Sequence, residues 1–328
     1  MVSSKSKYPV LVCAVDNNYA MPLAVTLRSV LENLKSYQKI VLFVIDGGIK
    51  ESNKHKISRS LNPDKVEINW VKPDNRRIKK MKVIRHLTLA AYYRLLIPEL
   101  LPAQFNKVIY LDADLIVNED LGKLWDIDMG ENYLLAVQDI GIGYVSSPLG
   151  VANYQELGIP PNSKYFCSGV MVINLEKWRI DSISVKTIEY VEQNKEHLRF
   201  ADQDGLNAVI AGKWGELDLR WNQIFHIFNY PSWQNSVIKE EVTEDVYNQA
   251  IHKPYIIHLA TGLKPWIYGC DHPAKDVFFQ YLYMTAYSGW RPEKTFKNRF
   301  RYMIGERYWQ NLEPLKGWTK QLMSFVRK

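Results

Sequence analysis

The stretch Val108-Ile109-Tyr110-Leu111-Asp112-Ala113-Asp114 decides the fold prediction for this chain of 328 residues. Its first half is apolar, as expected of a β-strand that is covered on both faces of a sheet. Two carboxylates follow directly. Residues i and i+2 of an extended chain point to the same side, so Asp112 and Asp114 are expected to share one face. Open α/β sheets bind ligands just beyond the carboxyl ends of their strands, so this strand end predicts a ligand site.

Further strands and helices alternate on both sides of this stretch. Apolar residues recur at helical spacing between residues 23 and 34, and again over Leu87–Leu96, where Pro98 is expected to stop the helix. The short apolar runs that read as strands are Val10–Val15, Ile40–Ile45, Val66–Val71, Lys107–Leu111 and Leu134–Val137. This alternation predicts an α/β fold with a mostly parallel, doubly wound sheet over residues 8–215.

The second half of the chain has weaker patterns. Residues 181–198 and 203–211 have helical spacing. Residues 140–166 are rich in Gly, Ser and Pro, which predicts a long irregular surface loop of the kind that often forms lids or binding loops. Residues 250–290 are aromatic-rich, and we expect them to be irregular apart from a short strand at Tyr255–Ile257.

The composition excludes several classes of protein. With 47% hydrophobic and 23% charged residues, the chain is globular rather than a coiled coil, collagen-like or disordered. Its three cysteines are far apart, which fits a reducing compartment and argues against a disulfide framework or a structural zinc site. We see no pattern of a signal peptide or of a membrane-spanning helix, and therefore expect a cytoplasmic protein.

The net charge of +7 resides in residues 291–328, which hold ten Lys and Arg against three Glu. This tail also carries two apolar stripes at helical spacing, formed by Phe296, Phe300, Ile304 and Tyr308, and by Leu315, Trp318, Leu322 and Phe325. Basic amphipathic helices of this kind can lie on an anionic membrane surface, so we expect peripheral attachment to the inner face of the membrane. The alternative is a helical pair packed on the protein body. Nothing resembles a base-reading module, so no nucleic-acid partner is expected.

Three groups of polar residues could carry chemistry. Two convergent carboxylates repel each other unless a divalent cation such as Mg²⁺ or Mn²⁺ lies between them, with diphosphate oxygens completing its coordination. His258 follows the predicted strand at Tyr255–Ile257 and could be a third ligand, while Lys264 could neutralise a phosphate. Taken alone, the carboxylates could equally form an ordinary acidic turn, and a lone histidine is more often buried and hydrogen-bonded.

The third group, Asp16-Asn17-Asn18-Tyr19, ends the first predicted strand. Asp and Asn side chains there could bind the edge of a base while Tyr19 stacks on its ring, although a polar strand-to-helix turn would have the same sequence.

Taken together, several dispersed motifs in one order resemble glycosyltransferase family 8, the retaining nucleotide-sugar transferases that include bacterial lipopolysaccharide galactosyl- and glucosyltransferases. The motifs are Ala14–Tyr19, Ile84–His86, Tyr93–Leu95, Leu111–Asp114, Phe166–Val170, Asn174-Leu175, Asp202–Asp204 and His258–Trp266. The resemblance implies a single GT-A type domain, Rossmann-like with a mixed sheet, over residues 8–290. Residues 8–215 would bind the nucleotide, and the remainder would form the acceptor side and the metal and phosphate loop. The tail, 291–328, resembles the membrane-association segment of the lipopolysaccharide enzymes.

The resemblance also assigns site residues. It places Mn²⁺, or Mg²⁺ in its stead, on Asp112, Asp114 and His258, and it assigns catalysis to Gln203, Asp202 and Asp139. The residues that it implies for a UDP-sugar donor are Ala14, Asp16, Asn18, Tyr19, His86, Arg94, Asp112, Ala113, Asp114, Cys167, Ser168, Gly262 and Lys264. The chain departs from the family pattern at Cys167, where Asn is usual, and at Thr261, where Gly is usual.

The implied activity is a Mn²⁺-dependent, retaining transfer of a hexose, galactose or glucose, from a UDP-sugar to a hydroxyl of a glycan or lipid-linked saccharide. Its place would be lipopolysaccharide or cell-surface glycan synthesis. The cation and Lys264 would stabilise the leaving diphosphate, and Gln203 with a nearby carboxylate would stabilise positive charge at the anomeric carbon. Two alternatives are a glycoside hydrolase that uses paired carboxylates and a non-catalytic membrane- or RNA-binding module that uses the tail.

Overall fold

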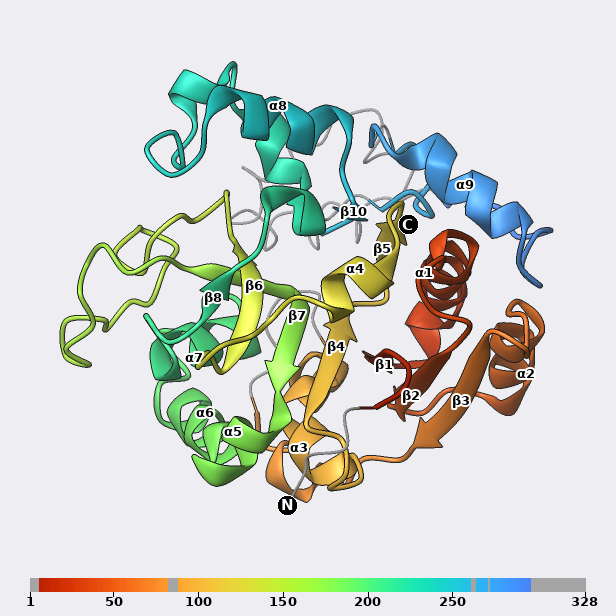
Figure 1. Cartoon of the computed structure of the whole chain (residues 1–328), viewed down its shortest axis with the longest axis horizontal. Coiled ribbons are helices and arrows are strands. Elements are labelled where there is room, and N and C mark those ends of the chain that lie inside the picture. Colours follow the sequence, from red (N-terminus) through yellow and green to blue (C-terminus); the bar gives the residue numbers. More distant parts are fainter. Residues whose placement is uncertain (1–5, 82–87, 261–263, 271, 296–328) are drawn as a thin grey trace, which may run out of the picture.

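A seven-stranded mixed sheet forms the centre of the protein in a computed structural model that describes residues 6–81, 88–260, 264–270 and 272–295 (Figure 1). The strand order is β3-β2-β1-β4-β7-β6-β8. The strands are β1 (Val10–Val15), β2 (Ile40–Asp46), β3 (Val66–Val71), β4 (Lys107–Leu111), β6 (Leu134–Gln138), β7 (Phe166–Asn174) and β8 (Gly215–Glu216). Strand β7 runs antiparallel to β4 and β6, whereas the other neighbouring pairs are parallel. The prediction of an α/β fold with a mostly parallel sheet is therefore confirmed.

A second, three-stranded sheet joins distant parts of the chain. It consists of β5 (Leu115–Val117), β10 (Ile256–His258) and β9 (Gln223–Ile224), with β10 in the middle. Strand β5 starts directly after Asp114, and the antiparallel register pairs its first residue, Leu115, with His258. This pairing brings the end of β10 beside the carboxylates that follow β4.

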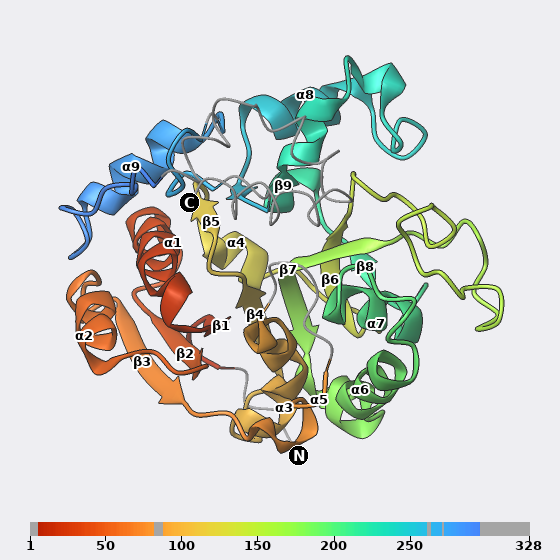
Figure 2. The same ribbon diagram turned by 180° about the vertical axis from the view of Figure 1, so that it is seen from behind.

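Nine α-helices surround the two sheets in the described part of the chain. They are α1 (Ala20–Asn33), α2 (Glu51–Arg59), α3 (Ile97–Leu100), α4 (Leu121–Trp125), α5 (Leu175–Ile180), α6 (Ile183–Gln193), α7 (Asp202–Val209), α8 (Glu244–His252) and α9 (Lys275–Tyr283). Helices α8 and α9 flank the small sheet in both views, and α5, α6 and α7 gather beside β6 and β7 (Figures 1 and 2). Within the described residues, no helix is both long enough and apolar enough to cross a bilayer.

The predicted helix over Leu87–Leu96 is partly wrong. The chain forms a 3₁₀ helix over Leu89–Leu96, capped by Thr88, and continues into α3 instead of stopping. Pro98 lies in the first turn of α3, where its missing N–H has no intrahelical partner to lose. Leu87 lies outside the described residues.

Of the predictions for the second half of the chain, some are confirmed and one is wrong. The two expected helices are shorter than their patterns, at Ile183–Gln193 and Asp202–Val209. No strand or helix lies between β6 and β7, as predicted for residues 140–166. The predicted short strand is confirmed as β10, but the expectation that the rest of 250–290 is irregular is wrong, because α9 packs there against α1. Of the predicted tail, residues 296–328 lie outside the described residues.

Helix α1 holds the start of the small sheet through hydroxyl and amide groups on one face. The hydroxyl of Thr26 lies 2.9 Å from the carbonyl oxygen of Ala113 and accepts from the backbone N–H of Leu115 at 3.1 Å. Ser29 accepts from the N–H of Val117 at 2.9 Å, and Asn33 donates to the Val117 carbonyl at 2.8 Å. These side chains lie three and four residues apart and so share a helix face. They take the place of a neighbouring strand along β5.

Candidate active site

The side chains of Asp112, Asp114 and His258 converge on one point. Nε2 of His258 lies 3.7 Å from Oδ2 of Asp112 and 3.5 Å from Oδ1 of Asp114, and the three ligand atoms lie within 4.8 Å of one another. These separations are too long for good hydrogen bonds. They suit ligands of a common cation, because ligands about 2.1 Å from an ion and at right angles to each other are about 3 Å apart. Two carboxylates and one imidazole fit Mn²⁺ or Mg²⁺ by donor type.

Backbone hydrogen bonds hold these three residues in place. The N–H of Asp112 donates to the carbonyl of Gly169 on β7 at 2.9 Å, which continues the ladder between β4 and β7. The N–H of Leu259 donates to the carbonyl of Asp114, also at 2.9 Å. The point of convergence therefore lies where the carboxyl ends of β4 and β10, each an inner strand of its sheet, come together.

Each carboxylate has one oxygen occupied by a neighbour and the other turned toward the shared centre. Oδ1 of Asp112 accepts from the hydroxyl of Tyr110 at 2.8 Å and from Arg94 at 2.9 Å. Oδ2 of Asp114 accepts from Nζ of Lys264 at 2.5 Å. Burial opposes ionisation of Asp114, yet Lys264 and His258 hold the pKa of this carboxyl well below its usual range. Asp114 is therefore available as an anion.

The ring of His258 follows the same pattern. Its Nδ1 lies 3.0 Å from Oδ1 of Asn222, while Nε2 is turned toward the carboxylates. Burial disfavours a charge on this ring, but Asp114 outweighs that effect and raises the pKa of His258 to about 10. Without a cation, the ring itself supplies the positive charge between the two carboxylates.

Gly169 is required by the close packing of this ring. A Cβ at this position would lie 2.2 Å from Cε1 of His258 and 3.0 Å from Oδ2 of Asp112. Any residue other than glycine would therefore displace the ring. Cys167, two residues earlier on β7, has its sulfur 3.9 Å from Nδ1 of His258. Strand β7 thus forms one wall against the imidazole.

Arg94 is a buried clamp behind the carboxylates. Its guanidinium donates to Asp112, to the carbonyl of Ser168 at 2.7 Å and to the Ser168 hydroxyl at 2.9 Å. Nε lies 3.0 Å from Oδ2 of Asp202. The flat guanidinium also stacks over the ring of Tyr110, 4.5 Å from its centroid. Arg94 therefore fixes the orientation of Asp112, whatever contact it makes with a ligand.

The three residues for which the family resemblance implies a catalytic role lie together. The amide oxygen of Gln203 accepts from the backbone N–H of Ser168 at 2.9 Å, and its Nε2 donates to Oδ2 of Asp139 at 3.1 Å. Burial raises the pKa of Asp139, which His226 partly opposes. Burial also raises the pKa of Asp202 to about 7, although the adjacent Arg94 pulls it down. Gln203 is thus held at both ends, between β7 and the end of β6.

A cavity of about 240 Å³ joins these groups. Its lining includes most of the predicted site residues, namely Ala14, Asp16, Tyr19, Arg94, Asp112, Ala113, Asp114, Asp139, Cys167, Ser168, Asp202, Gln203, His258 and Lys264. Asn18 is exposed and does not line it; its backbone N–H donates to Asp16, which caps the short 3₁₀ helix Asn17–Tyr19. His86 and Gly262 lie outside the described residues.

Some residues of the site were missed. Tyr110 lies two residues before Asp112 on the same strand face, so alternation could have revealed it. Asn222 and His226 have no comparable signal, because they come from a segment of short 3₁₀ helices and a two-residue strand, where no periodicity is present. Tertiary folding alone brings Asn222 beside His258 and His226 to the wall of the cavity.

The comparisons with known proteins agree with this geometry. The family model described as glycosyl transferase family 8 matches residues 10–270, and the chain belongs to glycosyltransferase family 8. General stress protein A of Bacillus subtilis is 32% identical over 283 residues, which cover 85% of this chain and 94% of that protein. The lipopolysaccharide 1,3-galactosyltransferase of Salmonella typhimurium is 26% identical over 81% of this chain and 75% of its own length.

Among solved structures, the galactosyltransferase LgtC in complex with donor and acceptor sugar analogues aligns with a TM-score of 0.71 at 27% identity. The alignment covers 89% of this chain and 99% of that one. The resemblance to family 8 and the GT-A type of fold are thus confirmed, and the prediction of a glycosyltransferase is confirmed at that level. The domain boundaries and the roles of individual site residues stay predictions.

Proposed function

We propose that this glycosyltransferase moves a hexose, galactose or glucose, from a UDP-sugar to a hydroxyl of a glycan or lipid-linked saccharide, with retention of configuration and dependence on Mn²⁺. We place it in lipopolysaccharide or cell-surface glycan synthesis. One observation supports the metal dependence. Asp112, Asp114 and His258 each direct one ligand atom toward a common centre, while the second polar atom of each side chain is hydrogen-bonded to a neighbour.

The nucleotide end of the donor would lie along β1. Asp16 and Tyr19 line the cavity at the carboxyl end of this strand, where α/β folds bind nucleotides. The ring of Tyr19 is held edge-on by Trp266, with 6.0 Å between ring centroids. Tyr19 can therefore present a fixed face to a base. This arrangement supports a uridine site.

The diphosphate would lie beside Lys264. This side chain is buried and reaches Asp114, and it also donates to the carbonyl of Leu259. An ammonium group so placed can stabilise negative charge on a leaving diphosphate. A bound divalent cation would supply further positive charge at the same oxygens.

The sugar end would lie beside Gln203. Its amide is oriented by Ser168 and Asp139, so its dipole points in a fixed direction without adding a charge to the cavity. Such a neutral amide beside buried carboxyls can stabilise positive charge at the anomeric carbon. With retention, the acceptor hydroxyl attacks from the face that the diphosphate leaves, and a leaving phosphate oxygen can take the acceptor's proton.

The geometry disfavours the glycoside hydrolase alternative. Hydrolases place two carboxyl groups about 5 to 9.5 Å apart on either side of the bond that breaks. Here Asp112 and Asp114 turn their oxygens toward the same atom, Nε2 of His258, at 3.7 and 3.5 Å. This is an arrangement for chelation.

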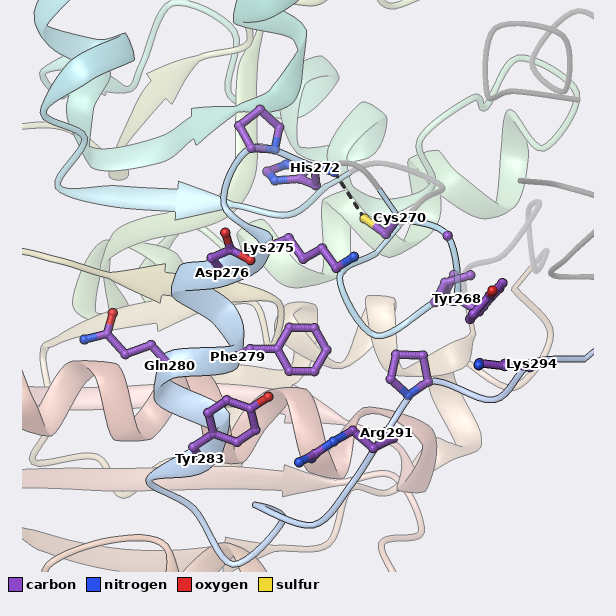
Figure 3. A pocket seen from close by; sticks show the side chains of 14 residues that line it. Tyr268, Cys270, His272, Lys275, Asp276, Phe279, Gln280, Tyr283, Arg291 and Lys294 are labelled. Atoms are coloured by element: carbon purple, nitrogen blue, oxygen red, sulfur yellow. Dashed lines mark hydrogen bonds between the residues drawn. The ribbon is translucent and has the colours of Figure 1, made fainter. Parts of the chain in front are cut away.

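Membrane association through residues 291–328 is part of the proposal. The start of this tail borders a hollow of about 1220 Å³ between α9 and the loop that begins at Ile267 (Figure 3). Arg291 lies over the ring of Tyr283 at 5.2 Å, and Lys294 over that of Tyr268 at 5.8 Å. Basic and aromatic side chains together suit an anionic lipid interface, so this surface supports attachment at the base of the tail.

The test is a panel of UDP-sugars with Mn²⁺, in which the release of UDP is measured with and without excess chelator. The best donor is then assayed with candidate lipid-linked glycans. The proposal requires turnover with one UDP-hexose and its loss in chelator. Sugar release from a glycan without any nucleotide would instead indicate a hydrolase, and absence of UDP–Mn²⁺ binding would indicate a non-catalytic module.

A further inference from the structure

Asn222 contacts His258, one of the three candidate metal ligands, although no pattern in the sequence indicates a role for it. It ends the 3₁₀ helix Leu219–Asn222, directly before β9, and the parallel pairing of β9 with β10 sets it beside His258. Both side chains are buried, and Oδ1 of Asn222 lies 3.0 Å from Nδ1 of His258. Packing alone does not explain an asparagine here. Its Nδ2 has no hydrogen-bond partner among the described residues, and a buried unpaired donor destabilises a fold.

The chemistry of this contact fixes the proton on one ring nitrogen. An amide oxygen can only accept, so Nδ1 must carry the hydrogen that it receives. A neutral imidazole has a single N–H, so its lone pair then belongs to Nε2, the atom that faces Asp112 and Asp114. The sulfur of Cys167 is the other neighbour of Nδ1, but at 3.9 Å it is a weak competitor.

We infer that Asn222 is a positioning residue for the metal centre. It keeps the hydrogen of His258 on Nδ1 and presents the lone pair of Nε2 to a divalent cation. This inference rests on the proposed Mn²⁺ dependence. Outer partners of this kind both orient a ligating histidine and select its tautomer, and their removal weakens metal binding about 10- to 100-fold.

The first experiment measures the affinity of the full chain for Mn²⁺ in the presence of UDP, by the electron paramagnetic resonance signal of unbound Mn²⁺. Asn222→Leu keeps the volume but removes the acceptor, and we expect about 10- to 100-fold weaker binding. Asn222→Asp keeps an acceptor at Nδ1, and we expect it to bind Mn²⁺ at least as tightly as wild type.

Gln223→Leu is the matched control. Gln223 is the next residue, is equally buried and donates to the carbonyl of Ala250 at 2.7 Å, away from the ligands. It should lose comparable stability in a thermal melt of the metal-free protein but retain wild-type Mn²⁺ affinity. Equal affinity in wild type and Asn222→Leu would overturn the inference. So would loss of binding in Asn222→Asp, which decides the matter if the leucine variant does not fold.

The second experiment reads the tautomer directly. Histidine labelled with ¹⁵N is observed by nuclear magnetic resonance in the complex with UDP and Cd²⁺, a diamagnetic substitute for Mn²⁺, with His258→Ala used to assign the signal. We expect a proton on Nδ1 and cadmium coupling at Nε2. Cadmium coupling at Nδ1 would contradict the inference. If wild type binds neither ion, the proposed metal dependence fails instead, so the two failures are distinguishable.

Discussion

The hydroxyl of Thr26, in the middle of α1, lies 2.9 Å from the carbonyl oxygen of Ala113, the residue between the two aspartates of the cluster. Both groups are buried. The first helix of the chain therefore helps to hold in place the segment that carries the two aspartates, and the Thr26 hydroxyl is its contact next to them.

Thr26→Val tests this contact. Valine has nearly the shape of threonine but leaves the backbone polar groups of residues 113 and 115 without their partner, which destabilises a fold by about 1–3 kcal/mol. We expect that loss in urea denaturation, with weaker binding of UDP and Mn²⁺. Thr26→Ser keeps the hydroxyl and should retain the binding. Similar binding by the valine variant would show that α1 only supports the fold.

Asp114→Asn tests the cluster itself. The amide keeps the shape of the side chain but removes the charge that Lys264 and a cation share, so we expect UDP release to fall by about 100-fold or more while the far-ultraviolet circular dichroism is unchanged. The matched control is Asp46→Asn. Asp46 also ends a strand of the same sheet but binds Lys54 and the loop after β2. Full activity of Asp114→Asn would remove the proposed mechanism.

Gly169→Ala tests the close approach of β7 to His258. The added methyl would lie 2.2 Å from Cε1 of the ring and 2.7 Å from Nδ1, so the ring must move. We expect a lower melting temperature and at least tenfold weaker Mn²⁺ binding. At Gly289 a Cβ would meet nothing within 4 Å, and Gly289→Ala serves as the neutral comparison. Unchanged Mn²⁺ affinity in Gly169→Ala would mean that the ring does not bind the ion.

Asp202 predicts a pH dependence of stability. Burial raises its pKa from the ordinary 3.8 to about 7, so between these pH values the metal-free folded protein holds a proton that the unfolded chain releases. The contribution of Asp202 to the free energy of unfolding is therefore complete below about pH 4 and is lost as the pH rises through 7. Asn does not titrate, so the stability of wild type relative to Asp202→Asn should fall across this window. Urea midpoints at several pH values measure it, and a constant difference would contradict the assignment.

Truncation after Trp290 tests the tail. We expect the shortened protein to lose binding to vesicles that contain anionic lipid, because the whole net charge of +7 lies beyond this point. Slow hydrolysis of the donor should persist, since Trp290 follows every cavity residue in the chain. Replacing the basic residues of the tail by Gln in the full-length chain provides the control for an altered fold. Vesicle binding that survives both changes would place the membrane contact elsewhere.

Short, local patterns were the part of the sequence that could be interpreted correctly. The apolar strand before Asp112 and Asp114 appears as β4, and the strands at residues 10, 40, 66 and 134 lie near their predicted limits. Strands can be predicted from such runs because a strand that is buried on both faces must be apolar, whichever strands lie next to it. The helix at Leu89–Leu96 is a 3₁₀ helix, and the spacing of apolar residues over so short a segment does not distinguish that form from an α-helix. Helix α9 was missed because aromatic residues on both sides hid its periodicity.

Local residue patterns were enough to predict the alternation of strands and helices, the carboxylate pair at a strand end and the concentration of charge in the tail, since each depends only on residues close together in the chain. The tertiary structure alone decided what surrounds those carboxylates. Arg94, Gly169, Asn222 and His258 come from four separate segments, and their meeting depends on the register of β7 against β4 and of β10 against β5 and β9. Register is set by the packing of whole sheets, which no local pattern contains.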